Sequence, residues 1–204
     1  SAAIIRAELE RASKLGASFL MTHLGSSKDV DEDEARGMVI TGLSKALDGY
    51  AGATVFCLEI AAGAGHVLGD TFEAIGTYIK AIEKKNPVLK NSIGVCFDTC
   101  HAFASGYDLR HAAAVKATMN DFNKHIGFAR LKLVHANDSK FDLGEKKDRH
   151  EHIGRGKIGL AGFEAMAKHP ALNQVDWYLE TEPDGVKKDI AALKTQLFYL
   201  EKTG

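Results

Sequence analysis

Five short apolar segments alternate with longer segments of helical periodicity, and this alternation limits the folds open to the chain. The apolar segments are residues 18–23, 53–59, 92–98, 131–135 and 175–180. The helical patterns cover about residues 4–15, 31–48, 70–85, 110–125 and 161–168, and a last one runs to about residue 200. Apolar runs that alternate with helices are typical of βαβ units with a parallel sheet.

Each predicted strand ends in a side chain that can bind a metal or transfer a proton. In chain order these are His23, Glu59, Asp98, His135 and Glu180. A (β/α)8 barrel collects functional groups from the carboxyl ends of several strands, whereas an open doubly wound sheet gathers them at one switch point. The pattern therefore predicts an α/β fold of the (β/α)8 TIM barrel class. A typical barrel has about 250 residues. We therefore expect residues 1–204 to form a single barrel domain with roughly the last five βα units, lacking its N-terminal strands.

Eight His, Asp and Glu side chains are candidate metal ligands. Besides the five at the strand ends, His101 follows Asp98 closely, and the polar segment of residues 136–158 adds Asp148 and His150. Imidazole and carboxylate ligands without thiolate suit Zn2+ or Mn2+. One zinc takes about four ligands, so the set predicts at least two ions. Clusters of divalent ions with such ligands are well suited to phosphodiester hydrolysis.

Charge and cysteine usage narrow the possible partners and compartment. The formal net charge is −1, so any contact with nucleic acid must come from a local basic patch. The chain has three cysteines, Cys57, Cys96 and Cys100. We expect buried, free thiols and a reducing, cytoplasmic compartment. No apolar run approaches the roughly 18 residues of a membrane span, so a membrane partner is not expected.

Several blocks of the sequence resemble the endonuclease IV family. The longest, GVCFDTCHAFASGYD, spans residues 94–108, and VHANDSK and DRHEHIG follow at residues 134–140 and 148–154. Shorter matches contain His23, Glu59 and Glu180, so the similarity covers about residues 19–183. The chain also departs from the family, which usually has Asn-Thr where Ile60 and Ala61 follow Glu59.

The resemblance implies a zinc-dependent enzyme of base excision repair that cuts double-stranded DNA 5′ to abasic sites and is monomeric at full length. It implies three zinc ions, with Mn2+ acceptable at some sites. Glu59 and Glu180 would serve catalysis, and Arg149 would contact the DNA backbone. The implied ligand sets are His23 and Glu59 with a histidine from an earlier strand; Glu59, Asp98, His135 and Glu180; and His101, Asp148 and His150.

Two other functions fit part of this pattern. Sugar isomerases and epimerases with xylose-isomerase-like barrels hold one divalent metal with Glu, Asp, His and Glu on successive strands. The residues Glu59, Asp98, His135 and Glu180 would satisfy this arrangement. The remaining four ligands would then have no role, which favours the nuclease. A third interpretation is a metal-binding fragment without catalysis. The remaining histidines are interpreted as surface or supporting residues: His66, His111, His125, His152 and His169.

Overall fold

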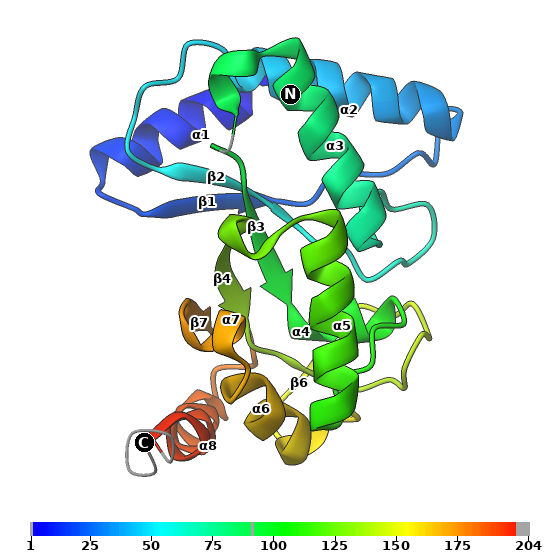
Figure 1. The fold of residues 1–204 in the computed structure, drawn as a ribbon, viewed down its shortest axis with the longest axis vertical. Coiled ribbons are helices and arrows are strands. Elements are labelled where there is room, and N and C mark those ends of the chain that lie inside the picture. The colour runs from blue at the N-terminus through cyan, green and yellow to red at the C-terminus, as the bar shows by residue number, and fades with distance from the viewer. Residues whose placement is uncertain (1, 91, 199–204) are drawn as a thin grey trace.

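The computed structural model describes residues 2–90 and 92–198, and it has the predicted α/β class in the form of a half-barrel (Figure 1). Within these residues one five-stranded sheet has the order β1-β2-β3-β4-β7. Each strand pairs in parallel with its neighbour. The strands are β1 (Phe19–Thr22), β2 (Val55–Glu59), β3 (Gly94–Asp98), β4 (Leu131–His135) and β7 (Asp176–Tyr178).

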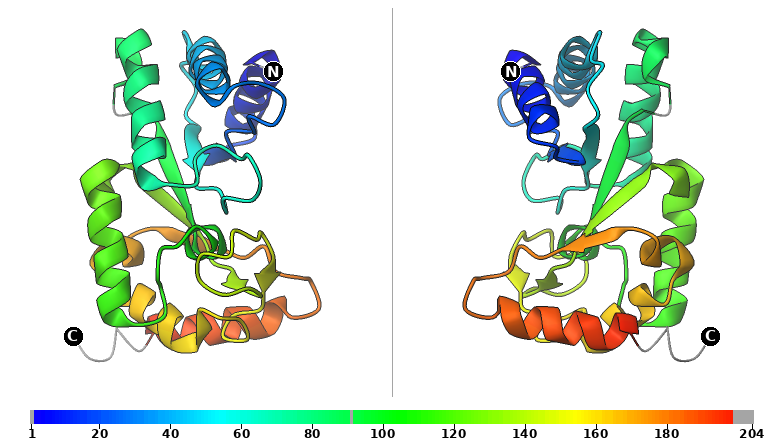
Figure 2. Two further views of the ribbon diagram at one scale, coloured as in Figure 1. Left: turned by 90° about the vertical axis from the view of Figure 1, so that its right-hand side faces the viewer. Right: turned by 90° about the vertical axis from the view of Figure 1, so that its left-hand side faces the viewer.

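The longer helices form a continuous row along the sheet (Figures 1 and 2). Consecutive members of the row contact one another, from α1 to α8. They are α1 (Ala2–Lys14), α2 (Glu32–Leu47), α3 (Phe72–Lys85), α5 (Ala112–His125), α6 (Gly159–Ala167) and α8 (Val186–Phe198). The part of the last predicted helix beyond residue 198 lies outside the described residues.

Shorter elements fill the connections between strands and helices. They are the helices α4 (Thr99–Ala104) and α7 (Pro170–Asn173), the 3-10 turns η1 (Pro87–Leu89) and η2 (Phe128–Arg130), and a small antiparallel pair of strands, β5 (Asp138–Ser139) and β6 (His150–Glu151). None of these short elements was predicted from the sequence. Both α4 and the β5–β6 pair carry candidate ligands, so they matter for the site.

Local capping explains where two of the long helices begin. The Asp31 side chain accepts hydrogen bonds from the backbone N–H groups of Asp33 (2.9 Å) and Glu34 (3.4 Å). Three acidic residues then occupy the first turn of α2, where the helix dipole favours them. The hydroxyl of Thr71 accepts from the N–H of Ala74 in α3 in the same way. The acidic run of residues 29–34 is therefore a helix start.

The main apolar core lies between the sheet and the row of helices. Phe72 and Phe97 are fully buried in it, and the Phe72 ring meets Phe122 edge-on at 5.3 Å. Burial of each such ring stabilises the fold by about 1.5–3 kcal/mol. The opposite face of the sheet carries a second, smaller cluster formed by Cys57, Cys96 and Leu133 with Phe19, Met21 and Val55.

This second face of the sheet is open between its edge strands. A pocket of about 410 Å³ runs along it from Phe19 and Met21 of β1 to Tyr178 of β7. The same pocket reaches His135 and Glu180 at the carboxyl ends of the strands. The concave side of the half-barrel therefore leads to the candidate ligands. None of the described helices is long and apolar enough to span a membrane.

Candidate metal centre

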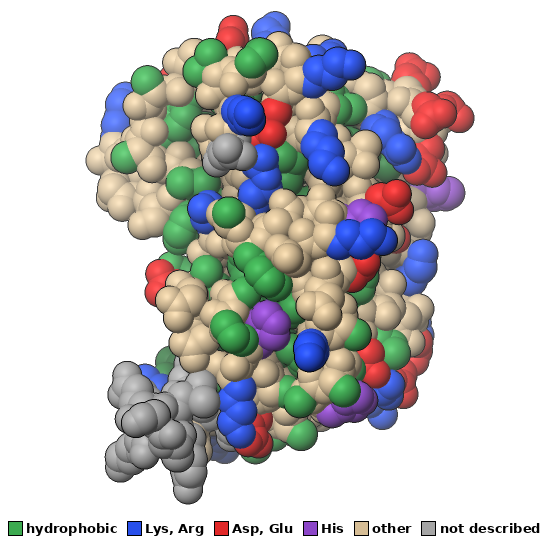
Figure 3. All heavy atoms as spheres, viewed as in Figure 1, with side chains coloured by type: hydrophobic (Ala, Val, Ile, Leu, Met, Phe, Trp, Pro, Cys, Tyr) green, Lys and Arg blue, Asp and Glu red, His purple; other side chains and the backbone are tan. Residues whose placement is uncertain are grey.

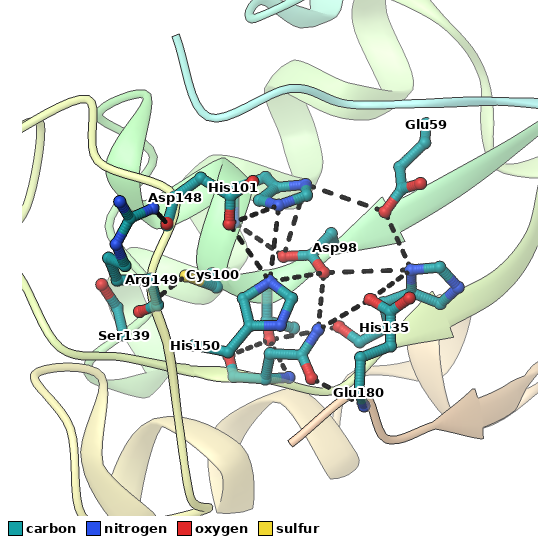
Figure 4. Close-up of polar contacts among 12 residues, drawn as sticks. Glu59, Asp98, Cys100, His101, His135, Ser139, Asp148, Arg149, His150 and Glu180 are labelled. Atoms are coloured by element: carbon teal, nitrogen blue, oxygen red, sulfur yellow. Dashed lines mark hydrogen bonds and ion pairs between the residues drawn. The ribbon is translucent and has the colours of Figure 1, made fainter. Parts of the chain in front are cut away.

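The carboxyl ends of the parallel strands bring five predicted ligands to one edge of the sheet, and Figure 4 shows four of them, Glu59, Asp98, His135 and Glu180. Glu59, Asp98 and His135 are the last residues of β2, β3 and β4. His23 follows β1 by one residue, and Glu180 follows β7 by two. The last strand is thus shorter than the sequence predicted, because its ladder with β4 stops at the pair of His135 and Tyr178.

Helix α4 adds His101 to this edge. Asp98 is the N-cap of α4, and its Oδ1 accepts the backbone N–H of His101 at 2.7 Å. One turn of helix therefore separates the two side chains, which places both on the same side of the sheet edge. The spacing of three residues between Asp98 and His101 therefore corresponds to a strand end followed by one capped turn of helix.

The polar segment after β4 brings the remaining two ligands. Strands β5 and β6 pair with each other, with Ser139 opposite His150. This pairing folds the segment back over the sheet edge, so that His150 Nε2 lies 3.5 Å from Asp148 Oδ1 and 3.4 Å from His101 Nε2. All eight predicted ligands therefore belong to one connected cluster.

The cluster has a buried floor and an open rim. The side chains of Glu59, Asp98, His101 and His135 are at most 7 % exposed. His23, Asp148 and Glu180 are 46 %, 51 % and 43 % exposed. A pocket of about 310 Å³ opens between His23 and Asp148, with small residues such as Ala61, Ala62 and Ser26 on its other walls. A substrate can reach the rim from this side, while the floor stays shielded from water.

The inner part of the cluster converges on one nitrogen of His135. Its Nδ1 lies 2.8 Å from Glu59 Oε1 and 3.0 Å from Glu180 Oε2. Asp98 Oδ2 lies 3.9 Å from the same nitrogen. These four side chains offer donor atoms that all lie within 4.8 Å of one another, as a shared cation requires.

The outer part of the cluster is a triangle of three donor atoms. His101 Nε2 lies 3.2 Å from Asp148 Oδ1, and the other two sides measure 3.5 Å and 3.4 Å. Donors bound to one tetrahedral zinc at 2.0–2.2 Å lie roughly 3.4 Å apart. The three side chains therefore already have the spacing of one face of a zinc tetrahedron.

The backbone sets the orientation of the His101 ring. His101 Nδ1 lies 3.0 Å from the carbonyl oxygen of Ile60, so this nitrogen donates its proton to the carbonyl. Metal-binding histidines commonly fix their tautomer through such a bond, which leaves the other nitrogen as the donor to the metal. The contact uses the backbone of Ile60, so it does not depend on the side chain that the family usually has there.

The charges in the cluster strongly perturb one another. Burial lowers the pKa of His101, but Asp98, Asp148 and Glu59 outweigh it and raise the pKa to about 9. The hydrogen bond from His101 lowers the pKa of Asp148 to about 2. Burial raises the pKa of Asp98, the most enclosed carboxyl group of the cluster. Buried carboxylates thus draw positive charge into the centre, which is the property of a cation site.

Asn137 is a member of the centre that was not predicted from the sequence. It is fully buried, and its Nδ2 donates to Asp98 Oδ2 at 2.7 Å and to Glu180 Oε2 at 3.2 Å. Its Oδ1 accepts the backbone N–H of Glu180 at 3.0 Å. Asn137 therefore ties the exit of β7 to the end of β3. Its position two residues after the end of β4 was the feature of the sequence that could have identified it as a site residue.

The other histidines lie away from the cluster, and four of them have structural partners there. His152 Nδ1 lies 2.8 Å from Asp189 Oδ2, which links the loop to α8. His111 and His169 cap α5 and α7, and His125 lies 3.4 Å from Asp121. His66 is exposed. As predicted, none of them joins the cluster within the part of the chain that the structure describes.

The three cysteines are free and buried, as predicted. Burial raises the pKa of Cys57, Cys96 and Cys100 to about 12 in each case. Cys96 nevertheless lies beneath the cluster, with its sulfur within 4.8 Å of donor atoms of Glu59 and His135.

One basic side chain next to the cluster comes from the polar segment of residues 136–158. Arg149 is exposed between two candidate ligands, and its Nη1 donates to the backbone oxygen of Asp148 at 2.5 Å. On the face shown in Figure 3, Lys and Arg side chains are scattered among acidic and polar ones and form no continuous basic surface. This distribution agrees with the formal net charge of −1.

Comparison with known proteins places this arrangement in a family. Residues 1–196 match the family model described as "Xylose isomerase-like TIM barrel". A probable endonuclease 4 of Methanoculleus marisnigri is 38 % identical over 190 residues, which are 93 % of this chain and 66 % of the relative. An apurinic-apyrimidinic endonuclease of Caenorhabditis elegans is 40 % identical over 181 residues, 87 % of this chain and 43 % of the relative.

A solved structure shows the same likeness. The crystal structure of endonuclease IV from Thermus thermophilus superimposes with a TM-score of 0.80 and 29 % sequence identity. The superposition covers 98 % of this chain and 68 % of that one. This chain therefore spans about two thirds, or less, of the length of the proteins that it resembles.

Proposed function

Because the chain belongs to the endonuclease IV family of xylose isomerase-like TIM barrels, we propose that it acts as a metal-dependent endodeoxyribonuclease. The reaction would be hydrolysis of the phosphodiester bond 5′ to abasic sites in double-stranded DNA, as in base excision repair. The observation that carries this proposal is the outer triangle of His101, Asp148 and His150, with sides of 3.2–3.5 Å. It lies beside a complete inner ligand set, so the centre has donors for more than one ion.

The ligand sets divide the cluster into three proposed zinc positions. Glu59 belongs to two of them, because its Oε1 lies 2.8 Å from His135 Nδ1 and its Oε2 lies 3.7 Å from His23 Nε2. Asp98, His135 and Glu180 complete the inner position with Glu59. The outer triangle forms the third position. Mn2+ has similar ligand preferences and could replace zinc at some of them.

Divalent ions bound here would lower the pKa of a bound water and offset the negative charge of a phosphodiester. The chain's own residues prepare this chemistry. The floor of Glu59, Asp98, His101 and His135 is almost completely buried, while Asn137 holds the carboxylates of Asp98 and Glu180 in place. Glu180 and Asp148 extend from this floor to the exposed rim, where a DNA backbone can approach them. We propose Glu59 and Glu180 as the catalytic carboxylates on this basis.

A one-metal sugar isomerase or epimerase is the second candidate. It is supported by the inner set of Glu59, Asp98, His135 and Glu180, whose donor atoms alone could hold one ion. His101, Asp148 and His150 would then be superfluous, although their side chains meet as closely as those of the inner set. We therefore favour the nuclease.

Two measurements on one preparation separate these functions. We expect more than one zinc per chain by elemental analysis, and cleavage of a duplex with one abasic site but not of the same duplex without it. A single divalent ion with sugar isomerisation and no cleavage would establish the second candidate. Bound metal with neither activity would identify a metal-binding fragment.

We also propose a partner, an oligomeric state and a location for the protein. The partner would be abasic double-stranded DNA, and the protein would be monomeric at full length. The buried, free cysteines agree with a cytoplasmic location, where thiols stay reduced.

A further inference from the structure

Asp138 is a fully buried carboxylate that lies outside the ligand set. Its Oδ1 accepts backbone N–H groups from Ser139 (2.8 Å) and Ile158 (2.9 Å). Its Oδ2 accepts them from Gly154 (3.0 Å), Gly156 (3.0 Å) and Gly159 (3.2 Å). Hydrogen bonds to an ionised acceptor are roughly twice as strong as neutral ones. Five of them on one carboxylate make it a strong organising centre for the backbone.

These five donors lie at the two ends of a single segment. Ser139 begins the segment that leaves the sheet edge, and residues 154–159 end it at the start of α6. A further hydrogen bond joins the same ends, from the N–H of Lys157 to the oxygen of Ser139 at 2.8 Å. Between these ends the segment carries Asp148 and His150, two corners of the outer triangle. Asp138 thus closes the loop that delivers them.

The backbone around Asp138 is shaped to fit this carboxylate. Gly154 and Gly159 have positive φ angles of +78° and +73°, which side-chain-bearing residues rarely adopt. At Gly156 a Cβ atom would overlap both the oxygen of Ser139 and the Asp138 carboxylate. The N–H groups can approach the carboxylate only because these positions are glycine.

Asn137 and Asp138 are neighbours in the chain, but their side chains form hydrogen bonds with different parts of the centre. The Asn137 amide bonds to Asp98 and Glu180, both in the inner part. Within the described residues, the hydrogen bonds of the Asp138 side chain all go to backbone groups of its own segment. Neighbouring residues therefore stabilise the inner ligands and the outer loop separately.

We propose that Asp138 is the positioning residue of the outer part of the centre, because its carboxylate holds residues 139–159 in the fold that brings Asp148 and His150 to His101. The proposal rests on the proposed function only in taking these three side chains as ligands of one ion. The loop-closing role itself can be tested without metal.

The test uses Asp138→Asn in the whole chain, with trypsin cleavage and metal content as the two measurements. The variant keeps the shape of the side chain but replaces one acceptor oxygen by an NH2 group, so the N–H donors facing it lose their acceptor. We expect cleavage within the loop to accelerate on the order of tenfold. We also expect the loss of one ion per chain while the others remain. The loop offers trypsin the sites Lys140, Lys146, Lys147, Arg149, Arg155 and Lys157.

Asp31→Asn is the matched control. The Asp31 carboxylate also accepts backbone N–H groups, those of Asp33 at 2.9 Å and Glu34 at 3.4 Å, but it lies outside the loop at the start of α2. This variant should leave both the loop cleavage and the metal content as in the wild type. Gly156→Ala disturbs the same contact from the side of the loop and should reproduce both effects of Asp138→Asn.

Each outcome bears on the proposal. Unchanged loop cleavage and metal content in both Asp138→Asn and Gly156→Ala would overturn it. Equal acceleration at helical sites such as Lys80 and Lys116 would also overturn it, since that result means global unfolding. If loop cleavage accelerates but the wild type holds only one ion, the loop-closing role stands and the multi-metal function fails.

Discussion

Glu59 is the residue on which the proposed chemistry most depends. It is 7 % exposed, and its two carboxylate oxygens face different histidines. A carboxylate can bridge two cations only if both oxygens carry negative charge, because a neutral amide offers one acceptor and one donor. The identity of this single side chain therefore decides whether two ions can share the floor of the centre.

Replacement of Glu59 by Gln should disturb two metal positions at once. We expect the variant to bind fewer ions and to lose abasic-site cleavage by several orders of magnitude, since water activation and charge neutralisation both depend on the bridged pair. Metal analysis and a nicking assay measure the two effects. Glu73→Gln, at an exposed position in α3, is the control and should change neither. Retention of more than about a tenth of the wild-type rate would disprove a bridging role.

Arg149 should contribute one phosphate contact to DNA binding. It is exposed and adjoins two candidate ligands, Asp148 and His150, and a guanidinium is well suited to phosphate. Arg149→Ala should weaken binding to an abasic duplex and reduce the slope of log affinity against log salt by about one. Lys14→Ala removes another exposed charge, at the C-terminal end of α1, and should leave the slope unchanged. If the slope in Arg149→Ala equals that of the wild type, Arg149 does not contact the backbone.

At the scale of elements, packing between helices holds the strand ends in register. Helices α3 and α5 pack through the main apolar core against β2, β3 and β4, which end in Glu59, Asp98 and His135. They approach each other closely at Gly76, where a Cβ atom would overlap the carbonyl oxygen of His125 at the end of α5. Gly42 lies inside α2, and a Cβ atom added to it would meet no other atom within 4 Å. A side chain is therefore excluded at Gly76 but can be accommodated at Gly42.

Substitution of these two glycines by alanine should change stability in opposite directions. Gly76→Ala should lower the free energy of unfolding by about 1–3 kcal/mol, because the added methyl group pushes α3 away from α5. Gly42→Ala should raise it by up to about 1 kcal/mol, because alanine restricts the unfolded chain and favours the helix. Urea denaturation measures both. Equal stability of Gly76→Ala and the wild type would contradict the close approach of the helices.

At the scale of the whole molecule, the sheet is an open half-barrel. Within the described residues, β1 and β7 each pair on one side only, and the concave face between them carries apolar side chains. Unpaired strand edges beside an apolar face are templates for association with another chain. We therefore propose that the isolated chain of 204 residues self-associates.

A charge on the concave face should reduce this self-association. Met21 belongs to the apolar cluster on that face, and a lysine there can reach solvent along the pocket. Met21→Lys should lower the mean mass of the chain in sedimentation or light-scattering measurements at equal concentration. Met38→Lys, at a position 61 % exposed on α2, should not. A wild-type chain that stays monomeric at every concentration would show that the open face does not mediate association.

The sequence alone determined the strands, their parallel order and the residue types at their ends. Each of these follows from short-range patterns: an apolar run of about five residues, a polar residue where it stops, and a helix before the next run. For this reason the pattern of residues is enough to assign Glu59, Asp98 and His135 to one edge of a sheet. The parallel sheet and the match to the family model confirmed the expected α/β barrel class.

Only the tertiary structure decided how the outer part of the centre is built. The β5–β6 pair, the loop closed on Asp138 and the side-chain hydrogen bonds of Asn137 to Asp98 and Glu180 all join residues that lie far apart in sequence. Such contacts leave no periodicity in the chain, so the segment of residues 136–158 could be predicted only as a polar loop. Buried hydrogen-bond acceptors must find donors wherever the fold places them. That requirement, which acts only in the folded chain, brings Asp148 and His150 to His101.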